Sequence, residues 1–247
     1  MKLVSRPAVD GTLEFRFDFR WLLSFTALVF IHAEFHEIAH TAVGRLLCGA
    51  WGPRNFNYWE IACSDRPALL LSSVAGLLFS YGLMWVGYYL LRPGTSSERK
   101  SLGFCLMFAA IPFGRLATVG LGGGDEMFLL ETLFTNTDPT LLWVVAVGGV
   151  FGLITPPLYR AFTALSQQRR WLVFVGFLFI PILVFMTVIL GVGNTLLREG
   201  VLARPGILGS PLIVNVWTGL WLVLLVALWR HLSTTLIPMA GEQSVQN

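Results

Sequence analysis

The sequence predicts an all-α polytopic membrane protein with six transmembrane helices and a short interfacial β element near the active site, and three observations support this fold class. Of the 247 residues, 55% are hydrophobic and only 13% are charged. The mean hydropathy is +0.70, which is too high for a chain whose surface faces water. Apolar stretches recur that reach the roughly 20 residues needed to cross about 30 Å of hydrocarbon as a helix. The lipid bilayer is therefore the expected solvent.

The N-terminal segment, residues 1–20, has no apolar stretch ahead of its charged residues, so no cleavable signal peptide is predicted. Within it, residues 13–19 alternate strictly between apolar and charged side chains, which is the period of a β-strand. We therefore expect an interfacial strand at 13–19, which could hold a substrate by strand addition.

Six apolar helices follow this segment. The predicted spans are residues 21–48, 67–91, 101–121, 141–162, 171–192 and 211–232. The connection 49–66 is rich in Trp, Tyr, Asn and Phe, so we expect a hairpin or loop at the level of the lipid headgroups. The other Phe and Trp residues are expected to contact lipid. This divides the chain into the N-terminal segment 1–20, a three-helix core 21–134, and a region 135–247 with three further helices and a polar tail.

The distribution of basic residues predicts the orientation. Six spans place both termini on one side, and eleven of the 17 Lys and Arg residues lie on that side, five lie opposite, and Arg115 lies within a span. Positive residues accumulate in cytoplasmic loops, so both termini are expected in the cytoplasm and the protein in the cell (cytoplasmic) membrane. The basic residues are scattered through short connections, which argues against a nucleic-acid partner. A bridge between Cys48 and Cys63 is possible if their loop faces an oxidising compartment.

The residues that carry chemistry lie near the end of the first span, as His36-Glu37-x-x-His40. On a helix the two histidines lie one turn apart and about 40° apart around the axis, so both imidazoles can bind one zinc ion. Glu37 projects beside them, where it can act as the general base. The alternative is that the motif arose by chance near a helix end. Because ionisable groups at membrane depth are costly, their clustering favours a function.

A third ligand is expected at the same membrane level, because the chain crosses twice after His40 and arrives at Gly122-Gly123-Gly124-Asp125-Glu126. Asp125 is the candidate, and the glycines permit close approach of the backbone to a metal. The alternative role for Asp125 is to cap a short helix at 126–134. The two roles are compatible.

These motifs resemble the site-2 protease family of intramembrane zinc metalloproteases, in its compact form without a PDZ domain, over roughly residues 21–134. Residues 35–40 match the family's first core element, Ala75-Gly76-Leu77 looks like its Ala-Gly-Pro element with the proline replaced, and Gly124-Asp125-Glu126 resembles the element that brings an aspartate to zinc. Ser80 stands near the place of a family asparagine that contacts substrate. The resemblance implies one Zn²⁺ per chain, held by His36, His40 and Asp125.

The function expected is therefore hydrolysis of peptide bonds in transmembrane or membrane-proximal protein substrates, with Glu37 as catalytic base. Two alternatives stay open. One is a Ste24-like membrane metalloprotease, in which Glu131 would be the third ligand. The other is a non-catalytic metal-binding scaffold or transporter. Nearby, His32 is expected to bond a neighbouring backbone group, and Arg115 to pair with an acid or contact a substrate carbonyl.

Overall fold

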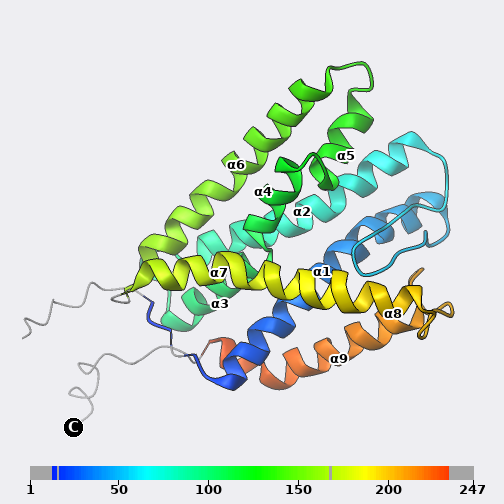
Figure 1. The fold of residues 1–247 in the computed structure, drawn as a ribbon. Helices are drawn as coiled ribbons and strands as arrows, with labels where there is room; N and C mark the ends of the chain where they lie inside the picture. Colours follow the sequence, from blue (N-terminus) through cyan, green and yellow to red (C-terminus); the bar gives the residue numbers. More distant parts are fainter. Residues whose placement is uncertain (1–12, 16, 167–168, 234–247) are drawn as a thin grey trace, which may run out of the picture.

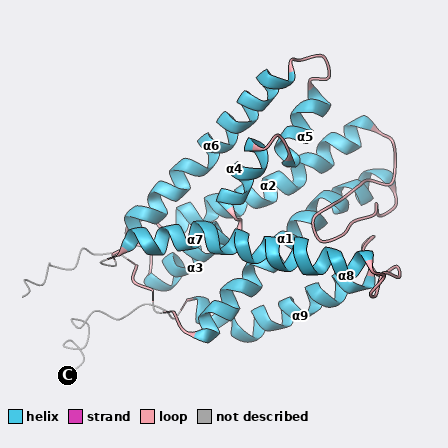
Figure 2. Cartoon of the chain, viewed as in Figure 1, coloured by secondary structure: helices cyan, strands magenta, loops and turns pink. Residues whose placement is uncertain are grey.

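The computed structural model describes residues 13–15, 17–166 and 169–233, and in that part of the chain every regular element is a helix (Figure 2). Six helical segments are long and apolar enough to cross a membrane. They are α1 (Phe19–Cys48), α2 (Arg66–Leu90), α3 (Ser97–Ala109) with α4 (Pro112–Gly120), α6 (Pro139–Ala164), α7 (Arg170–Phe185) with η1 (Met186–Gly193) and α8 (Asn194–Arg198), and α9 (Leu212–Leu228) with η2 (Trp229–Leu232). The short α5 (Gly124–Leu133) lies between α4 and α6. The predicted fold class, a multi-pass all-helical membrane protein, is confirmed.

Helix α1 runs through the middle of the bundle and packs against α2, α3 and α9 (Figure 1). Its ends are set by local chemistry. The Asp18 carboxylate accepts the Trp21 N–H at 2.7 Å as N-cap, and Gly49 ends the helix with a φ of 77°. The buried face of α1 includes several polar residues, namely His32, Glu34, His36, Glu37, His40 and Thr41. A central helix with buried ionisable groups is what a site inside the bundle requires.

The third predicted span is not one continuous helix, because α3 ends at Ala109 and α4 begins at Pro112. Ile111, between them, has a φ of 48°, a left-handed conformation that costs a β-branched residue energy. Pro112 lacks an N–H and its ring clashes with the preceding turn, which explains a break at this point. Irregular backbone at membrane depth is tolerated where it is buried or lines a cavity, and Ala109, Ala110 and Ile111 do line a cavity.

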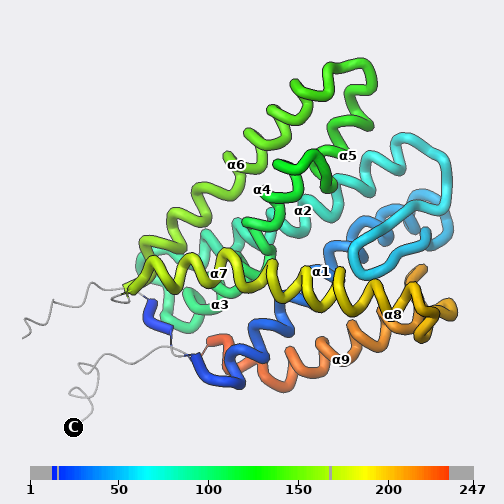
Figure 3. The backbone as a smooth tube through the Cα atoms, in the orientation of Figure 1, coloured from blue at the N-terminus to red at the C-terminus, as the bar shows by residue number. Residues whose placement is uncertain are grey.

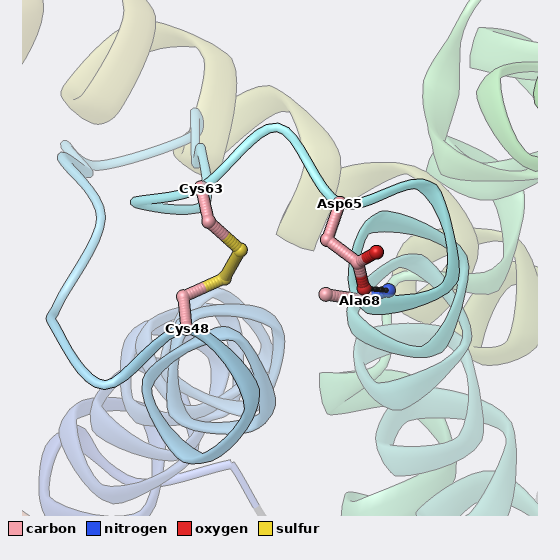
Figure 4. Close-up of a disulfide and its surroundings, with 4 residues drawn as sticks. All are labelled: Cys48, Cys63, Asp65 and Ala68. Atoms are coloured by element: carbon pink, nitrogen blue, oxygen red, sulfur yellow. Dashed lines mark hydrogen bonds between the residues drawn. A yellow bond between two sulfur atoms is a disulfide. The ribbon is translucent and has the colours of Figure 1, made fainter.

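The connection between α1 and α2 folds back as a loop beside the end of α1 and close to α8 (Figure 3). A disulfide joins Cys48, at the end of α1, to Cys63, with the two Cα atoms 5.5 Å apart (Figure 4). Just beyond it, the Asp65 carboxylate accepts the Ala68 N–H at 3.0 Å and begins α2. The only β contact in this loop is a single antiparallel bridge between Arg54 and Trp59.

A buried ion pair ties the loop to the helices. Arg54 donates to the Glu34 carboxylate of α1 at 3.0 Å, and both side chains are at most 3% exposed. Thr218 of α9 donates to the same carboxylate at 2.9 Å, and Arg54 also donates to the Leu208 carbonyl at 3.2 Å. Removing one partner of a buried pair typically costs about 3–5 kcal/mol. The loop is therefore held in place by α1 and by the C-terminal helices together.

The prediction of a strand at residues 13–19 is wrong. In the described residues of that segment, Leu13 makes one parallel bridge to Leu165 at the end of α6, donating to the Ala164 carbonyl at 2.7 Å. The segment ends at Phe19, where α1 begins. Leu13 and Phe15 are buried in the apolar core, and this burial explains their alternation without a sheet. Because this contact lies at the opposite end of α1 from His40, it supplies no strand for a substrate near the site.

Candidate metal centre

Three side chains from two helices converge at the level predicted from the motif. His36 Nε2 lies 3.1 Å from His40 Nε2 and 2.9 Å from Asp125 Oδ2, and His40 Nε2 lies 3.6 Å from Asp125 Oδ1. One ligand atom from each residue lies within 4.8 Å of the others. The two histidines are buried on α1, and Asp125 lies in the first turn of α5. The topology thus brings together the three ligands that were predicted.

Backbone carbonyls of α2 orient both imidazoles. His36 Nδ1 lies 2.8 Å from the Gly76 carbonyl oxygen, and His40 Nδ1 lies 2.7 Å from that of Ser72. A carbonyl can only accept, so each Nδ1 carries the proton and donates it. Each Nε2 is then left with a lone pair directed at the centre. This is the arrangement by which outer groups set the tautomer of metal-bound histidine.

The donor set fits a zinc ion. A tetrahedral zinc site with bonds of about 2.0–2.1 Å separates neighbouring ligand atoms by about 3.3 Å, close to the three separations above. Two imidazole lone pairs and a carboxylate oxygen at such distances repel one another unless a cation lies among them. Two nitrogen donors and one oxygen donor are also a usual set for catalytic zinc, which keeps a further position for water. The site is therefore chemically coherent as a metal centre.

Glu37 lies beside the ligands with an uncommitted oxygen. The residue is 8% exposed, and its Oε2 has no hydrogen-bond partner among the residues that the structure describes. Glu37 and His36 both line a cavity of about 520 Å³. A buried carboxylate oxygen without a partner is costly, so its retention here is consistent with a role as proton acceptor.

Trp59 of the connecting loop covers the ligands. Its ring stacks on His40 with centroids 4.2 Å apart and an interplanar angle of 6°, and its Nε1–H donates to Asp125 Oδ1 at 3.2 Å. Arg115 of α4 donates from Nη1 to Asp125 Oδ2 at 2.9 Å. Burial raises the pKa of Asp125, but the Arg115 guanidinium beside it favours the ionised form, and the pKa lies well below its usual range. Asp125 is therefore a carboxylate.

The sequence analysis placed Trp59 in a loop at the level of the lipid headgroups and did not predict that its ring covers the candidate ligands. The pairing of Cys48 with Cys63 was the available signal, since it folds the loop back over the end of α1. The expectation for His32 was also wrong. Its Nε2 has no partner in the described part of the chain, and its ring packs on Phe79 at 5.2 Å.

The structure also tests the expectations for Arg115, Asp125 and Glu131. Arg115 pairs with an acid, Asp125, as expected. The capping role expected for Asp125 is wrong, because α5 begins at Gly124 with Gly123 as its N-cap and without a side-chain cap hydrogen bond, and Asp125 lies inside the first turn. Glu131 is exposed on α5 and does not belong to the group of candidate ligands found among the described residues.

Gly76 provides a test of the centre's packing. A Cβ added at Gly76 would lie 2.0 Å from His40 Nε2, whereas a Cβ at Gly82 of the same helix would meet nothing within 4 Å. We expect Gly76→Ala to displace the His40 ring and to weaken zinc affinity at least about 10-fold, the order found for disturbed outer-shell contacts. Competition with a chromophoric chelator measures this, with Gly82→Ala as the matched control. Equal zinc affinity in the two variants would contradict the geometry.

Asp125 and Glu131 distinguish the two possible ligand sets. Asp125→Ala removes the carboxylate whose Oδ2 contacts His36 and whose Oδ1 lies near His40, so zinc affinity should fall by about 10- to 100-fold or more. Asp125→Asn keeps the size of the side chain but not its charge, and it should also bind weakly. Glu131→Gln should leave zinc affinity nearly unchanged, because the residue is exposed and distant from the cluster. Zinc content after dialysis is the measurement, and the reverse pattern would support the Ste24-like ligand set.

The chain was compared with models of known protein families, with curated proteins and with solved structures. None of the three comparisons found a match. The chemistry of the centre is therefore argued from its own residues.

Proposed function

We propose that the protein is an intramembrane zinc metalloprotease that hydrolyses peptide bonds of transmembrane or membrane-proximal substrates. The observation that carries this proposal is the combination of three convergent ligands with the free carboxylate oxygen of Glu37 on the wall of one cavity. The resemblance of residues 35–40, 75–77 and 124–126 to the site-2 protease motifs adds support.

The proposed chemistry divides the work between the metal and Glu37. Zinc, when bound by His36, His40 and Asp125, supplies a Lewis acid for the scissile carbonyl and for the attacking water. Glu37 accepts one proton from that water as the water oxygen bonds to the carbonyl carbon. It then passes this proton to the amine nitrogen as the C–N bond breaks. The products are one carboxylate and one amine, with the second water proton completing the ammonium.

The cavity supports an apolar, extended substrate. Its lining includes apolar side chains of α7 and η1, among them Ile182, Phe185 and Leu190. Peptide bonds within a helix are shielded by their own hydrogen bonds, so a transmembrane substrate must unwind before cleavage. A cavity of about 520 Å³ admits a short unwound stretch, which makes a membrane protein with a locally unstable helix the expected partner.

A metal-binding scaffold or transporter remains the alternative class. Such a protein would need the three ligands but no general base. The unpartnered oxygen of Glu37 favours the enzyme, because a purely structural carboxylate at this depth would be expected to have a partner.

Two observations support an orientation with the site on the external face of the cell membrane and both termini in the cytoplasm. The excess of basic residues lies on the side of the termini. The disulfide between Cys48 and Cys63 lies at the same end of the bundle as the metal centre, and disulfides persist in oxidising compartments.

Glu37→Gln tests the catalytic mechanism. Both imidazoles remain, so zinc should stay bound, whereas hydrolysis should fall to background because the amide cannot accept the proton. The measurement is cleavage of model transmembrane substrates by purified protein, with zinc content determined on the same sample. Undiminished turnover would end the mechanism proposed here, and zinc binding with no hydrolysis by the parent protein would favour the scaffold.

Labelling of single cysteines tests the orientation. Asn136→Cys lies in an exposed loop at the site end, and Arg99→Cys lies exposed near the start of α3. Background should be low, because Cys105 is buried and Cys48 and Cys63 form the disulfide. A membrane-impermeant maleimide should label Asn136→Cys on intact cells and Arg99→Cys only after permeabilisation. The opposite result would place the centre on the cytoplasmic face.

A further inference from the structure

We propose that Arg115 donates hydrogen bonds to the carbonyl oxygen of the peptide bond being cleaved and stabilises the negative charge that develops there. This inference rests on the proposed proteolytic function and deepens it, because it assigns the oxyanion-stabilising group of the same site. It makes Arg115 a catalytic residue in addition to Glu37.

The break in the third span places Arg115 at the centre. The left-handed turn at Ile111 ends α3, and α4 restarts at Pro112, so Arg115 lies one turn into α4 with its N–H donating to the Ile111 carbonyl at 3.2 Å. Its side chain is 17% exposed and lines the same cavity as Glu37. An arginine at membrane depth is costly, and here its head group lies against the proposed ligands.

The two terminal nitrogens of the guanidinium have different roles. Nη1 is anchored, because it donates to Asp125 Oδ2 at 2.9 Å and lies 3.8 Å from Glu126 Oε1. Nη2 donates to the Ser80 hydroxyl at 3.2 Å. It also lies 2.9 Å from both Nδ1 and Nε2 of His36. Equal distances to both ring nitrogens place Nη2 against the ring and off the axis of the Nε2 lone pair, which stays directed at the metal position.

Nη2 is thus a charged donor whose contacts with the described residues are to neutral groups, the Ser80 hydroxyl at 3.2 Å and the His36 ring at 2.9 Å. A hydrogen bond from a guanidinium to an anionic oxygen is roughly twice as strong as one between neutral groups. An oxyanion beside the metal would therefore be a better acceptor than Ser80. Because Nη1 is held by a ligand of the metal, the position of Nη2 relative to the reacting carbon is set in advance, which is the condition for electrostatic catalysis.

Arg115 would assist the addition of water to the peptide carbonyl. When the water oxygen bonds to the carbonyl carbon, the π-electron pair moves onto the carbonyl oxygen and the water proton moves to Glu37. Arg115 donates to that oxygen while it is negative and keeps its own protons. The electron pair then re-forms the carbonyl as the C–N bond breaks, and Glu37 delivers its proton to the nitrogen.

The competing interpretation is that Arg115 only neutralises Asp125 and Glu126. Glu126, however, already accepts a hydrogen bond from the Tyr81 hydroxyl at 2.7 Å. Charge neutralisation also gives no reason for Nη2 to lie on the cavity wall against Ser80 and His36. The two interpretations make different predictions for inhibitor affinity. If Arg115 binds the oxyanion, its loss should weaken an inhibitor that carries an anionic oxygen there and spare one that does not.

The experiment compares wild type, Arg115→Gln and Arg115→Lys in the full-length protein loaded with zinc. The probes are a capped phosphinic dipeptide of leucine, whose tetrahedral anionic group occupies the place of the oxyanion, and the matching thiol dipeptide, which binds zinc through sulfur alone. Binding is followed by thermal shift and zinc content by chelator competition. Arg45→Gln is the control, since that arginine is exposed on the same helix as the motif.

The proposal expects Arg115→Gln to lose about 10²–10³-fold in phosphinic affinity and in kcat, the size found for removal of one oxyanion donor. Thiol affinity, zinc content and KM should change little, and Arg115→Lys should recover part of the loss. Unchanged phosphinic affinity, or parallel loss of zinc and of both inhibitors, would overturn the assignment. The binding measurements need no turnover, so they test Arg115 independently of proteolysis. If Arg115→Gln selectively weakened the phosphinic dipeptide but the wild-type protein cleaved no substrate, the proteolytic function alone would be refuted.

Discussion

The site depends on the contact between the histidine face of α1 and the backbone of α2. Because Gly76 has no side chain, the His40 ring can pack directly against the backbone of α2. A Cβ at position 76 would lie only 2.0 Å from His40 Nε2. The Ser72 and Gly76 carbonyls then accept from the two Nδ1 atoms. These bonds fix both tautomers and direct both lone pairs to one point. The close approach of two helices therefore arranges a pair of histidines on one helix face as a candidate metal centre.

The loop between α1 and α2 and the C-terminal helices both support this centre. The disulfide-closed loop brings Trp59 over His40 and Asp125, and the loop is held by the Arg54–Glu34 pair with Thr218 of α9. Side chains of α7 and the π-helical η1 contribute to the apolar lining of the cavity. The C-terminal helices thus position the loop and enclose the cavity, which gives the region 135–247 a structural reason to be present.

A membrane site must combine polar chemistry with an apolar surrounding, and this chain does so by interrupting one helix. The break at Ile111 and Pro112 frees backbone at membrane depth and turns α4 so that Arg115 faces the ligands. The charges are then largely compensated locally, because Arg115 faces Asp125 and Glu126 while Arg54 faces Glu34. This pairing lowers the cost of burying ionisable groups within an apolar bundle.

The sequence by itself determined the number and approximate limits of the six spans, because apolar length is a local property that the bilayer thickness makes decisive. It also determined the histidine pair with Glu37, since the spacing i, i+1, i+4 places them on adjoining faces of any helix. Counting crossings was enough to bring Asp125 to the same level. Only the tertiary structure decided that Leu13 and Phe15 pack in the core instead of forming a strand, that Trp59 covers the candidate centre, and that Arg115 lines the cavity. Those features depend on contacts between residues that lie far apart in the sequence, 19 positions for His40 and Trp59, and no local period encodes which distant side chains meet.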